Sequence, residues 1–204
     1  MNIAKEGLPF IAGAGIAGAC LWFIVKPIGI IVLAGAVFFL YFFRDPHRNI
    51  LQSENGILAP ADGKVMEIAN EGNIMVIRIF LSVFNVHIQR SPVAGMIKSV
   101  VYQPGKFLPA MNMGAHIVNE QNIFIVETPH GEIVVRQIAG ILARRVVSWV
   151  VPGQAVEAGQ KIGIIKFGSQ VDVAVPAAAQ MLVKKGDPVI AGVTVLARGA
   201  LKPS

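Results

Sequence analysis

The longest uncharged stretches of this 204-residue chain lie together at its N-terminus. Residues 7–25 are nineteen positions without a charge, Lys26-Pro27 interrupts them, and residues 28–43 are sixteen more. A helix needs roughly 20 apolar residues to cross a bilayer core, and about 17 at the short end. The first stretch is long enough, and the second, slightly short, ends in aromatic residues 41–43 that suit a membrane interface. The pattern predicts a membrane-anchoring apolar helical hairpin over residues 1–48.

Two arrangements of this hairpin remain open: both stretches span the bilayer, or the pair enters and returns on one side. A cleaved signal peptide is disfavoured, because no A-x-A-like exit follows the second stretch. The alternative without a membrane is a buried hydrophobic hairpin in a soluble protein. Lys5, Arg44 and Arg48 favour the cytoplasmic side by the positive-inside tendency. We therefore expect a protein of the cytoplasmic membrane whose remaining domain faces the cytoplasm.

From residue 49 to residue 204 the pattern changes to short runs rich in Val and Ile, separated by turn pairs such as Asp62-Gly63 and Pro152-Gly153. The runs that predict strands are 64–68, 74–80, 97–102, 123–127, 133–137, 162–166, 171–175 and 193–196. Residues 139–147 and 106–118 look helical or irregular instead. The predicted class of this second domain is mainly β, a compact sandwich or barrel-like sandwich.

One internal repeat supports that class. Residues 150–162 and 183–195 share the pattern Val-x-x-Gly-x-x-Val-x-Ala-Gly-x-x-Ile/Val, and residues 58–65 have a related pattern. Apolar residues and glycines at fixed steps predict the same hooked strand–turn–strand twice. The repeat resembles the biotinyl/lipoyl-like β-sandwich, also called the barrel-sandwich hybrid, which by itself indicates no function.

The composition of the chain limits the classes of partner that it is expected to bind. The chain is 54% hydrophobic with a mean hydropathy of +0.61, which is high for a plain soluble protein. Four of the 18 Lys and Arg and two of the 12 Asp and Glu precede residue 49, so the second domain carries 14 basic and 10 acidic residues. No basic block marks a nucleic-acid arm; the mild excess suits an anionic lipid leaflet or ordinary solubility. The single Cys20 excludes an intrachain disulfide and a cysteine metal site, and no metal is expected.

The candidate chemistry centres on Gly168-Ser169, which lies between two β-rich runs. A Gly-Ser bond held in a strained turn can break itself, because the serine hydroxyl can attack the preceding carbonyl; a solvated hairpin turn is the ordinary alternative. A base must take the hydroxyl proton. His87 lies in an apolar-flanked, ordered-looking segment, and Asp62 lies in a Pro-Ala-Asp-Gly turn. Each also has a purely structural interpretation. The other histidines are weaker candidates: His47, His116 and His130.

Several segments resemble the phosphatidylserine decarboxylase family, in its short, pyruvoyl-dependent form. They follow the family's order over residues 42–169: Phe42-Phe43-Arg44-Asp45-Pro46-x-Arg48, Ala59-Pro60-Ala61-Asp62-Gly63-Lys64-Val65, Phe84-Asn85-Val86-His87, Arg90-x-Pro92, Tyr102-x-Pro104-Gly105-Lys106-Phe107, Asn119-Glu120-x-Asn122, Gln137-Ile138-Ala139-Gly140-x-x-Ala143-Arg144-Arg145 and Phe167-Gly168-Ser169. The resemblance implies cleavage between Gly168 and Ser169, with Ser169 as the precursor of a covalent pyruvoyl cofactor. Asp62 matches the family's catalytic aspartate. His87 matches the first histidine of an H-x-x-H pattern in longer relatives, and Arg90 stands at the second.

The same resemblance implies an activity. The pyruvoyl group would form a Schiff base with the amine of phosphatidylserine, release carbon dioxide and yield phosphatidylethanolamine, in phospholipid biosynthesis. His87 is the first candidate for the proton donor. Arg144, Arg145 and Lys106 are candidates to bind the substrate phosphate or carboxylate. The two self-cleaved chains would stay assembled, and the oligomeric state remains open.

Two other function classes remain open from the sequence. A membrane-tethered carrier or adaptor could use the same sandwich, although neither repeat carries Met-Lys or Asp-Lys at its tip. An adaptor would keep the chain uncut. A pyruvoyl enzyme for a soluble amino acid is disfavoured, because a soluble substrate needs no membrane anchor.

Overall fold

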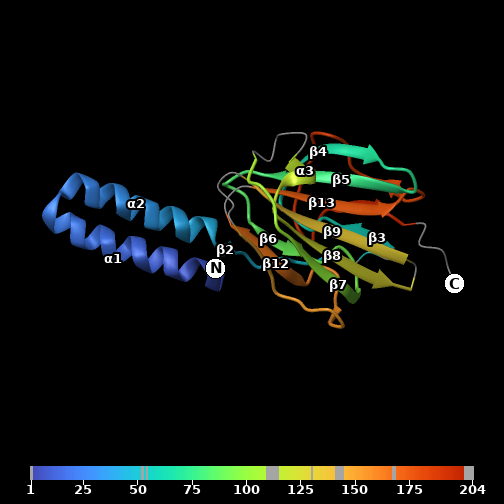
Figure 1. Ribbon diagram of the computed structural model, residues 1–204, viewed down its shortest axis with the longest axis horizontal. Helices are drawn as coiled ribbons and strands as arrows, with labels where there is room; N and C mark the ends of the chain where they lie inside the picture. The colour runs from blue at the N-terminus through green and yellow to red at the C-terminus, as the bar shows by residue number, and fades with distance from the viewer. Residues whose placement is uncertain are drawn as a thin grey trace. The chain divides into compact units, whose positions relative to one another are not determined.

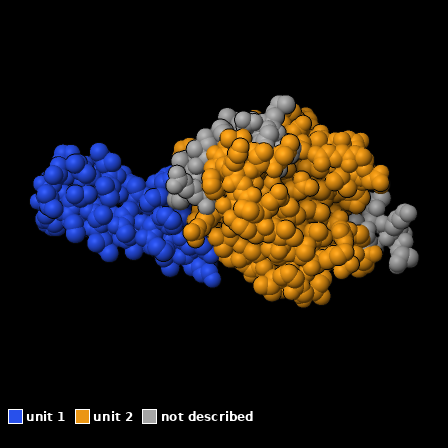
Figure 2. All heavy atoms as spheres, viewed as in Figure 1, with its two compact units in different colours: residues 1–47 blue, residues 48–204 orange. Residues whose placement is uncertain are grey.

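The computed structural model describes residues 2–51, 53, 55–108, 115–129, 131–140, 145–166 and 169–199 of the chain. It forms two compact units, residues 1–47 and residues 48–204 (Figure 2). Unit 1 is helical and unit 2 is built from strands (Figure 1).

Unit 1 is a helical hairpin. Its elements are β1 (Asn2–Ile3), the 3-10 helix η1 (Lys5–Gly7), α1 (Leu8–Ile24), α2 (Lys26–Phe42) and β2 (Arg44–Asp45). Each long helix has a proline in its first turn, where the missing N–H costs no helical hydrogen bond. The helices approach closely at glycines, since a Cβ at Gly18 would lie only 2.8 Å from Leu33 Cγ. β1 pairs antiparallel with β2 and joins the two ends of the hairpin.

The hairpin surface is apolar. The helical stretch Lys5–Ile24 is long and apolar enough to cross a membrane, and Lys26–Phe42 is shorter. Large apolar side chains are exposed along both helices: Ile16, Phe23, Ile24, Ile31 and Val37. The predicted apolar helical hairpin is therefore present, and its single qualifying helix gives limited support for membrane association.

Unit 2 holds the remaining elements. They are β3 (Gly56–Leu58), β4 (Gly63–Asn70), β5 (Ile74–Leu81), β6 (Ile88–Arg90), β7 (Gly95–Gln103), α3 (Ala115–Val118), β8 (Gln121–Thr128), β9 (Gly131–Ala139), β10 (Arg145–Ser148), β11 (Ala155–Val156), β12 (Lys161–Lys166), β13 (Ser169–Pro176), β14 (Gln180–Met181), β15 (Pro188–Val189) and β16 (Val195–Arg198). All eight strands expected from the Val- and Ile-rich runs are present. The mainly β class is confirmed.

One curled sheet of eight strands dominates unit 2, in the order β11-β7-β8-β9-β13-β5-β4-β15. Its neighbouring strands are antiparallel. Two three-stranded sheets, β10-β12-β6 and β14-β16-β3, share one apolar core with it. Phe124, Ile79 and Val173 enter that core from the large sheet, and Ile165 and Leu196 enter it from the small ones.

One sequence expectation fails within this architecture. Residues 139–147 were expected to be helical or irregular, but Arg145–Ser148 is strand β10. The reason is long-range pairing: Val146 and Val147 lie opposite Ile165 and Ile164 of β12, and Val146 is buried in the core. Residues 141–144 lie outside the described part of the chain. Within 106–118, residues Ala115–Val118 do form the short helix α3.

The internal repeat folds twice in the same way. Gly186 N–H donates to Val65 O and Val65 N–H to Asp187 O, while Gly153 N–H donates to Ile97 O and Ile97 N–H to Gln154 O. Gly153 and Gly186 both have positive φ, 83° and 97°, which glycine adopts without strain. A register irregularity follows Val65 in one half and Ile97 in the other, and such bulges bend a sheet. The repeat predicted from sequence is thus confirmed, and it extends to the strands that receive the hairpins.

Candidate active site

Ser169 begins the central strand β13 at one end of the large sheet. It pairs with Leu81 at the end of β5 and with Ala139 at the end of β9. The side chain of Ser169, together with Gly168, lies outside the described residues. The scissile bond proposed from sequence therefore immediately precedes a strand that is paired on both sides.

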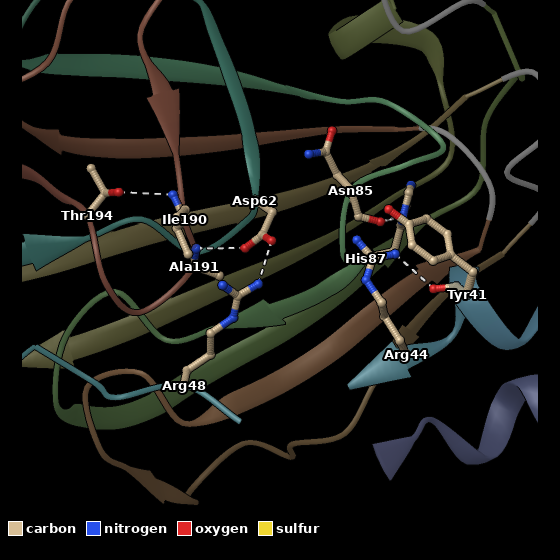
Figure 3. A network of polar contacts seen from close by, with 9 residues as sticks. All are labelled: Tyr41, Arg44, Arg48, Asp62, Asn85, His87, Ile190, Ala191 and Thr194. Atoms are coloured by element: carbon tan, nitrogen blue, oxygen red, sulfur yellow. Dashed lines mark hydrogen bonds and ion pairs between the residues drawn. The ribbon is translucent and has the colours of Figure 1, made fainter. Parts of the chain in front are cut away.

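The turn that follows Leu81 holds His87 near this sheet end. Asn85 Oδ1 accepts hydrogen bonds from Ser82 N at 2.9 Å and from Ser82 Oγ at 2.7 Å, which closes the turn. His87 is buried, and its Nδ1 lies 3.0 Å from Asn85 O (Figure 3). A carbonyl only accepts, so Nδ1 must carry the proton in this contact, and Nε2 of the neutral ring is then the nitrogen that can accept one.

A chain of buried amides fixes the segment that carries His87. Gln89 Nε2 donates to His87 O at 2.8 Å, and Gln137 Nε2 donates to Gln89 Oε1 at 2.7 Å. Asn122 Nδ2 in turn donates to Gln137 Oε1 at 3.1 Å. Gln89 and Gln137 are fully buried, so each needs these partners. The chain links β6 to β9 and β8, and Gln137 lies two residues before the Ser169 partner Ala139.

Asp62 lies at the same end of the sheet, just before β4. Lys64 pairs with Phe80 of β5, and Phe80 pairs with Gln170 of β13. Two strand spacings of ~4.8 Å separate β4 from β13, so the Asp62 backbone lies on the order of 10 Å from that of Ser169. Asp62 Oδ2 accepts from Arg48 Nη2 at 2.6 Å, and Oδ1 accepts from Ala191 N at 2.9 Å (Figure 3).

The opposite side of Ser169 carries amide, acidic and basic groups. Asn119 Nδ2 donates to Ala139 O at 2.7 Å, and Ala139 N donates to Glu120 O at 2.9 Å. The exposed Lys106 bridges this segment, because its N–H donates to Val118 O at 2.6 Å. The exposed Arg145 pairs with Lys166, three residues before Ser169.

The side chain of Glu120 connects these elements. Its Oε1 accepts from Val146 N at 3.3 Å, which ties the start of β10 to the start of β8. Desolvation first, and then the Glu120 carboxylate, raises the pKa of Tyr102 above its ordinary value, while Arg145 opposes the rise. Lys106 and Arg145 are exposed basic residues on the segments that neighbour Ala139 and Lys166 at this sheet end.

The structure thus places Ser169, His87, Asp62, Lys106 and Arg145 around one end of the large sheet. Arg144 and His130 lie outside the described residues, as does the side chain of His116. Sequence reasoning missed Gln89, Gln137 and Asn122 as supports of His87. They could have been found because each is an amide residue within or beside an apolar, strand-forming run. A buried amide in such a run requires a hydrogen-bond partner. Among the described residues no three His, Cys, Asp or Glu side chains form a group suited to a metal ion.

Comparison with known proteins identifies the family of this chain. The family model described as phosphatidylserine decarboxylase matches residues 36–197. A protein of Nitrobacter winogradskyi named phosphatidylserine decarboxylase proenzyme is 43% identical over 206 aligned positions, which cover 96% of this chain and 83% of that protein. The matched region includes Asp62, His87 and Gly168-Ser169. This chain therefore belongs to the phosphatidylserine decarboxylase family.

Proposed function

We propose that this chain is a phosphatidylserine decarboxylase that matures by cleaving itself between Gly168 and Ser169. The proposal rests on one observation above all: a Gly-Ser bond immediately precedes the central strand of a chain similar to a phosphatidylserine decarboxylase proenzyme. The product of the decarboxylation is phosphatidylethanolamine, so the reaction belongs to phospholipid biosynthesis.

Maturation uses only groups of the chain. Ser169 Oγ attacks the Gly168 carbonyl carbon and gives up its proton to a base; the acyl group moves from nitrogen to oxygen, which forms an ester and frees the amine of residue 169. Loss of the α-proton and departure of the Gly168 carboxylate leave dehydroalanine, and its hydrolysis yields a pyruvoyl group and ammonia. His87 Nε2 is the proposed base, because Nδ1 is held as a donor to Asn85 O.

The pairing of β13 supports a group that stays within the folded chain after cleavage. β13 pairs with β5 from Ser169 to Pro176 and with β9 from Ser169 to Ala174, so the fragment 169–204 would stay within the sheet after cleavage. The two fragments would therefore remain one assembled enzyme. The pyruvoyl group would supply an electrophilic carbonyl that accepts the headgroup amine as a Schiff base and withdraws the electrons of the departing carbon dioxide. Lys106, Arg144 and Arg145 are proposed to bind the headgroup phosphate or carboxylate, and His87 to return the proton.

The apolar hairpin would serve the same reaction by anchoring the enzyme to the bilayer that holds its substrate. We propose that residues 1–48 insert in the cytoplasmic membrane and that residues 49–204 face the cytoplasm, in line with Lys5, Arg44 and Arg48. Protease treatment of sealed inverted membrane vesicles should digest the second domain, whereas protection of that domain in such vesicles would place it on the other side.

An intact mass spectrum of the purified protein tests maturation. The expected result is two chains, 1–168 and 169–204, with a pyruvoyl-started smaller chain; release of carbon dioxide from phosphatidylserine by the same sample tests the activity. The variant Ser169→Ala should remain one inactive chain, because it lacks the attacking hydroxyl. Cleavage of that variant would exclude the mechanism, and an uncut, inactive wild-type protein would favour an adaptor.

A further inference from the structure

A short segment, residues 48–51, connects directly to Asp62 and to the second copy of the repeat. Arg48 Nη2 donates to Asp62 Oδ2 at 2.6 Å, and Leu51 N–H donates to Gly192 O at 3.0 Å. We call residues 48–51 the junction segment. Figure 3 shows the Arg48 guanidinium pointing at the Asp62 carboxylate, whose other oxygen faces Ala191.

Ile50 fixes the position of this segment. A Cβ added to Gly159 or to Gly192 would lie 2.7 Å from Ile50 Cδ1 in either case, so the isoleucine fills the space that both missing side chains leave. These two glycines occupy equivalent places in the two copies of the repeat, and their φ angles are 77° and 74°. The junction segment is therefore seated between the two hairpins, which limits how far Arg48 can move.

The pair that Arg48 makes is sheltered. The side chains of Arg48 and Asp62 are 17% and 12% exposed, so this pair is screened less than one in open solvent. The turn that presents Ala191 is itself closed, because Ile190 N donates to Thr194 Oγ1 at 2.9 Å (Figure 3). Arg48 and Ala191 together hold both oxygens of the carboxylate and define its orientation.

The repeat shows that the fold does not require an acidic residue here. Gly63 pairs with Val189 in one half, and Gly95 pairs with Val156 in the other. The residue before Gly63 is Asp62, and the residue before Gly95 is Ala94. The fold accepts alanine at the position equivalent to Asp62. The Asp62 carboxylate and its pairing with Arg48 are therefore not needed to form this turn, which indicates a functional role.

We propose that Arg48 is a positioning residue that orients the Asp62 carboxylate for maturation, and that the junction segment keeps Arg48 in place. The inference rests on the proposed function and, within it, on a catalytic role of Asp62 in maturation, which the resemblance to the family implies. Without the guanidinium, Oδ2 would lose its partner and the carboxylate could rotate about Ala191 N. A misplacement on the order of 1 Å can cost about 100-fold in rate. The expected slowing of self-cleavage is therefore roughly 10- to 100-fold.

The test follows self-cleavage of the full-length chain after synthesis, for wild type, Arg48→Gln, Arg48→Lys and Arg198→Gln. Arg198 is an exposed arginine outside the proposed site and controls for loss of charge. We expect R48Q to cleave roughly 10- to 100-fold more slowly, R48K to recover most of the rate, and R198Q to match wild type. Melting temperatures of the uncut chains, each also carrying Ser169→Ala, separate a folding defect from a positioning defect.

Each other outcome overturns the proposal. Wild-type rates for R48Q would show that Arg48 does not position the carboxylate, and equal slowing in R48K together with a large loss of melting temperature would show a structural role only. Asp62→Asn alone tests the catalytic role that the resemblance implies for Asp62: normal cleavage of D62N would show that maturation does not use this carboxylate, whereas self-cleavage of the wild-type chain tests the proposed function itself. If D62N is slow and R48Q/D62N is slower still by the full R48Q factor, Arg48 acts on something other than Asp62.

Discussion

Replacing Gln137 by leucine should destabilise unit 2 through two orphaned polar atoms. Gln137 accepts from Asn122 Nδ2 and donates to Gln89 Oε1, and these are the side-chain partners that the described residues provide for those two atoms. Leucine has a similar volume and no polar atom, so both neighbours would lose a hydrogen bond inside the protein. Gln89 is fully buried and Asn122 is 4% exposed, which excludes ready replacement by bulk water.

The size of the effect follows from the cost of each orphaned group. One buried donor or acceptor without a partner costs about 1–3 kcal/mol, so two cost roughly 2–6 kcal/mol. The additional apolar surface of leucine offsets about 1 kcal/mol of this. A net loss of about 3 kcal/mol corresponds to a fall of roughly 6–12 °C in melting temperature for a chain of this size.

The measurement is thermal unfolding in detergent, with every variant also carrying Ser169→Ala so that single chains are compared. Gln103→Leu is the matched control, because Gln103 is an exposed strand residue. We expect Q103L to melt within about 2 °C of its parent, since surface substitutions usually change stability little. If Q137L melts as Q103L does, the amide chain does not support the fold. The double variant Q89L/Q137L should lose less than the sum of its single losses, because the two side chains share one hydrogen bond.

Three further predictions follow from the described contacts. His87→Ala should slow maturation or decarboxylation; normal rates of both would assign the base to another residue. Gly192→Ala should melt well below Gly72→Ala, because both glycines have similar positive φ, 74° and 77°, but only a Cβ at residue 192 would meet a neighbour within 4 Å; equal melting temperatures would contradict this. The hydrogen bond that Lys98 Nζ donates to Glu132 Oε1, and then the charge of Glu132, raise the pKa of Lys98 above its ordinary 10.5. The stability from this pair is therefore present below pH 10.5 and lost as pH rises through the raised value. Glu132→Gln should therefore lower the melting temperature at pH 7 by no more than about 2 °C, since the pair is exposed, and a larger fall would refute that estimate.

Strands could be predicted from the sequence where a run of β-branched residues is flanked by turn residues. Runs such as 74–80 and 171–175 are rich in β-branched residues and flanked by turn residues, and both are strands in the structure. Residues 145–148 were not predictable in this way, because Val146 and Val147 become a strand by pairing with β12, which lies later in the chain. Local pattern does not contain that partner.

The candidate site likewise has residues that could be selected from the sequence and contacts that could not. Ser169, Asp62 and His87 could be selected from sequence because their residue types imply chemistry. The contacts that orient them could not be selected, since Gln137 and Gln89 are 48 positions apart and Arg48 is separated from Asp62 by 14. From sequence, Arg48 was a positive charge near the membrane and part of a family motif, with no partner indicated. In the structure Arg48 donates a hydrogen bond to the Asp62 carboxylate and forms an ion pair with it.

The contacts of Arg90 show how the fold uses the position at which longer relatives have a second histidine. It stands where the family resemblance implies a second histidine, and its Nη1 donates to Gly159 O at 2.8 Å while its backbone N–H donates to Pro60 O at 2.8 Å. A guanidinium remains protonated and has no acceptor, so this residue cannot take a proton from Ser169. The position is used instead to join the first copy of the repeat to the segment that precedes Asp62. Arg90 therefore leaves the proposed base of maturation with His87, three residues earlier, whose Nδ1 lies 3.0 Å from Asn85 O.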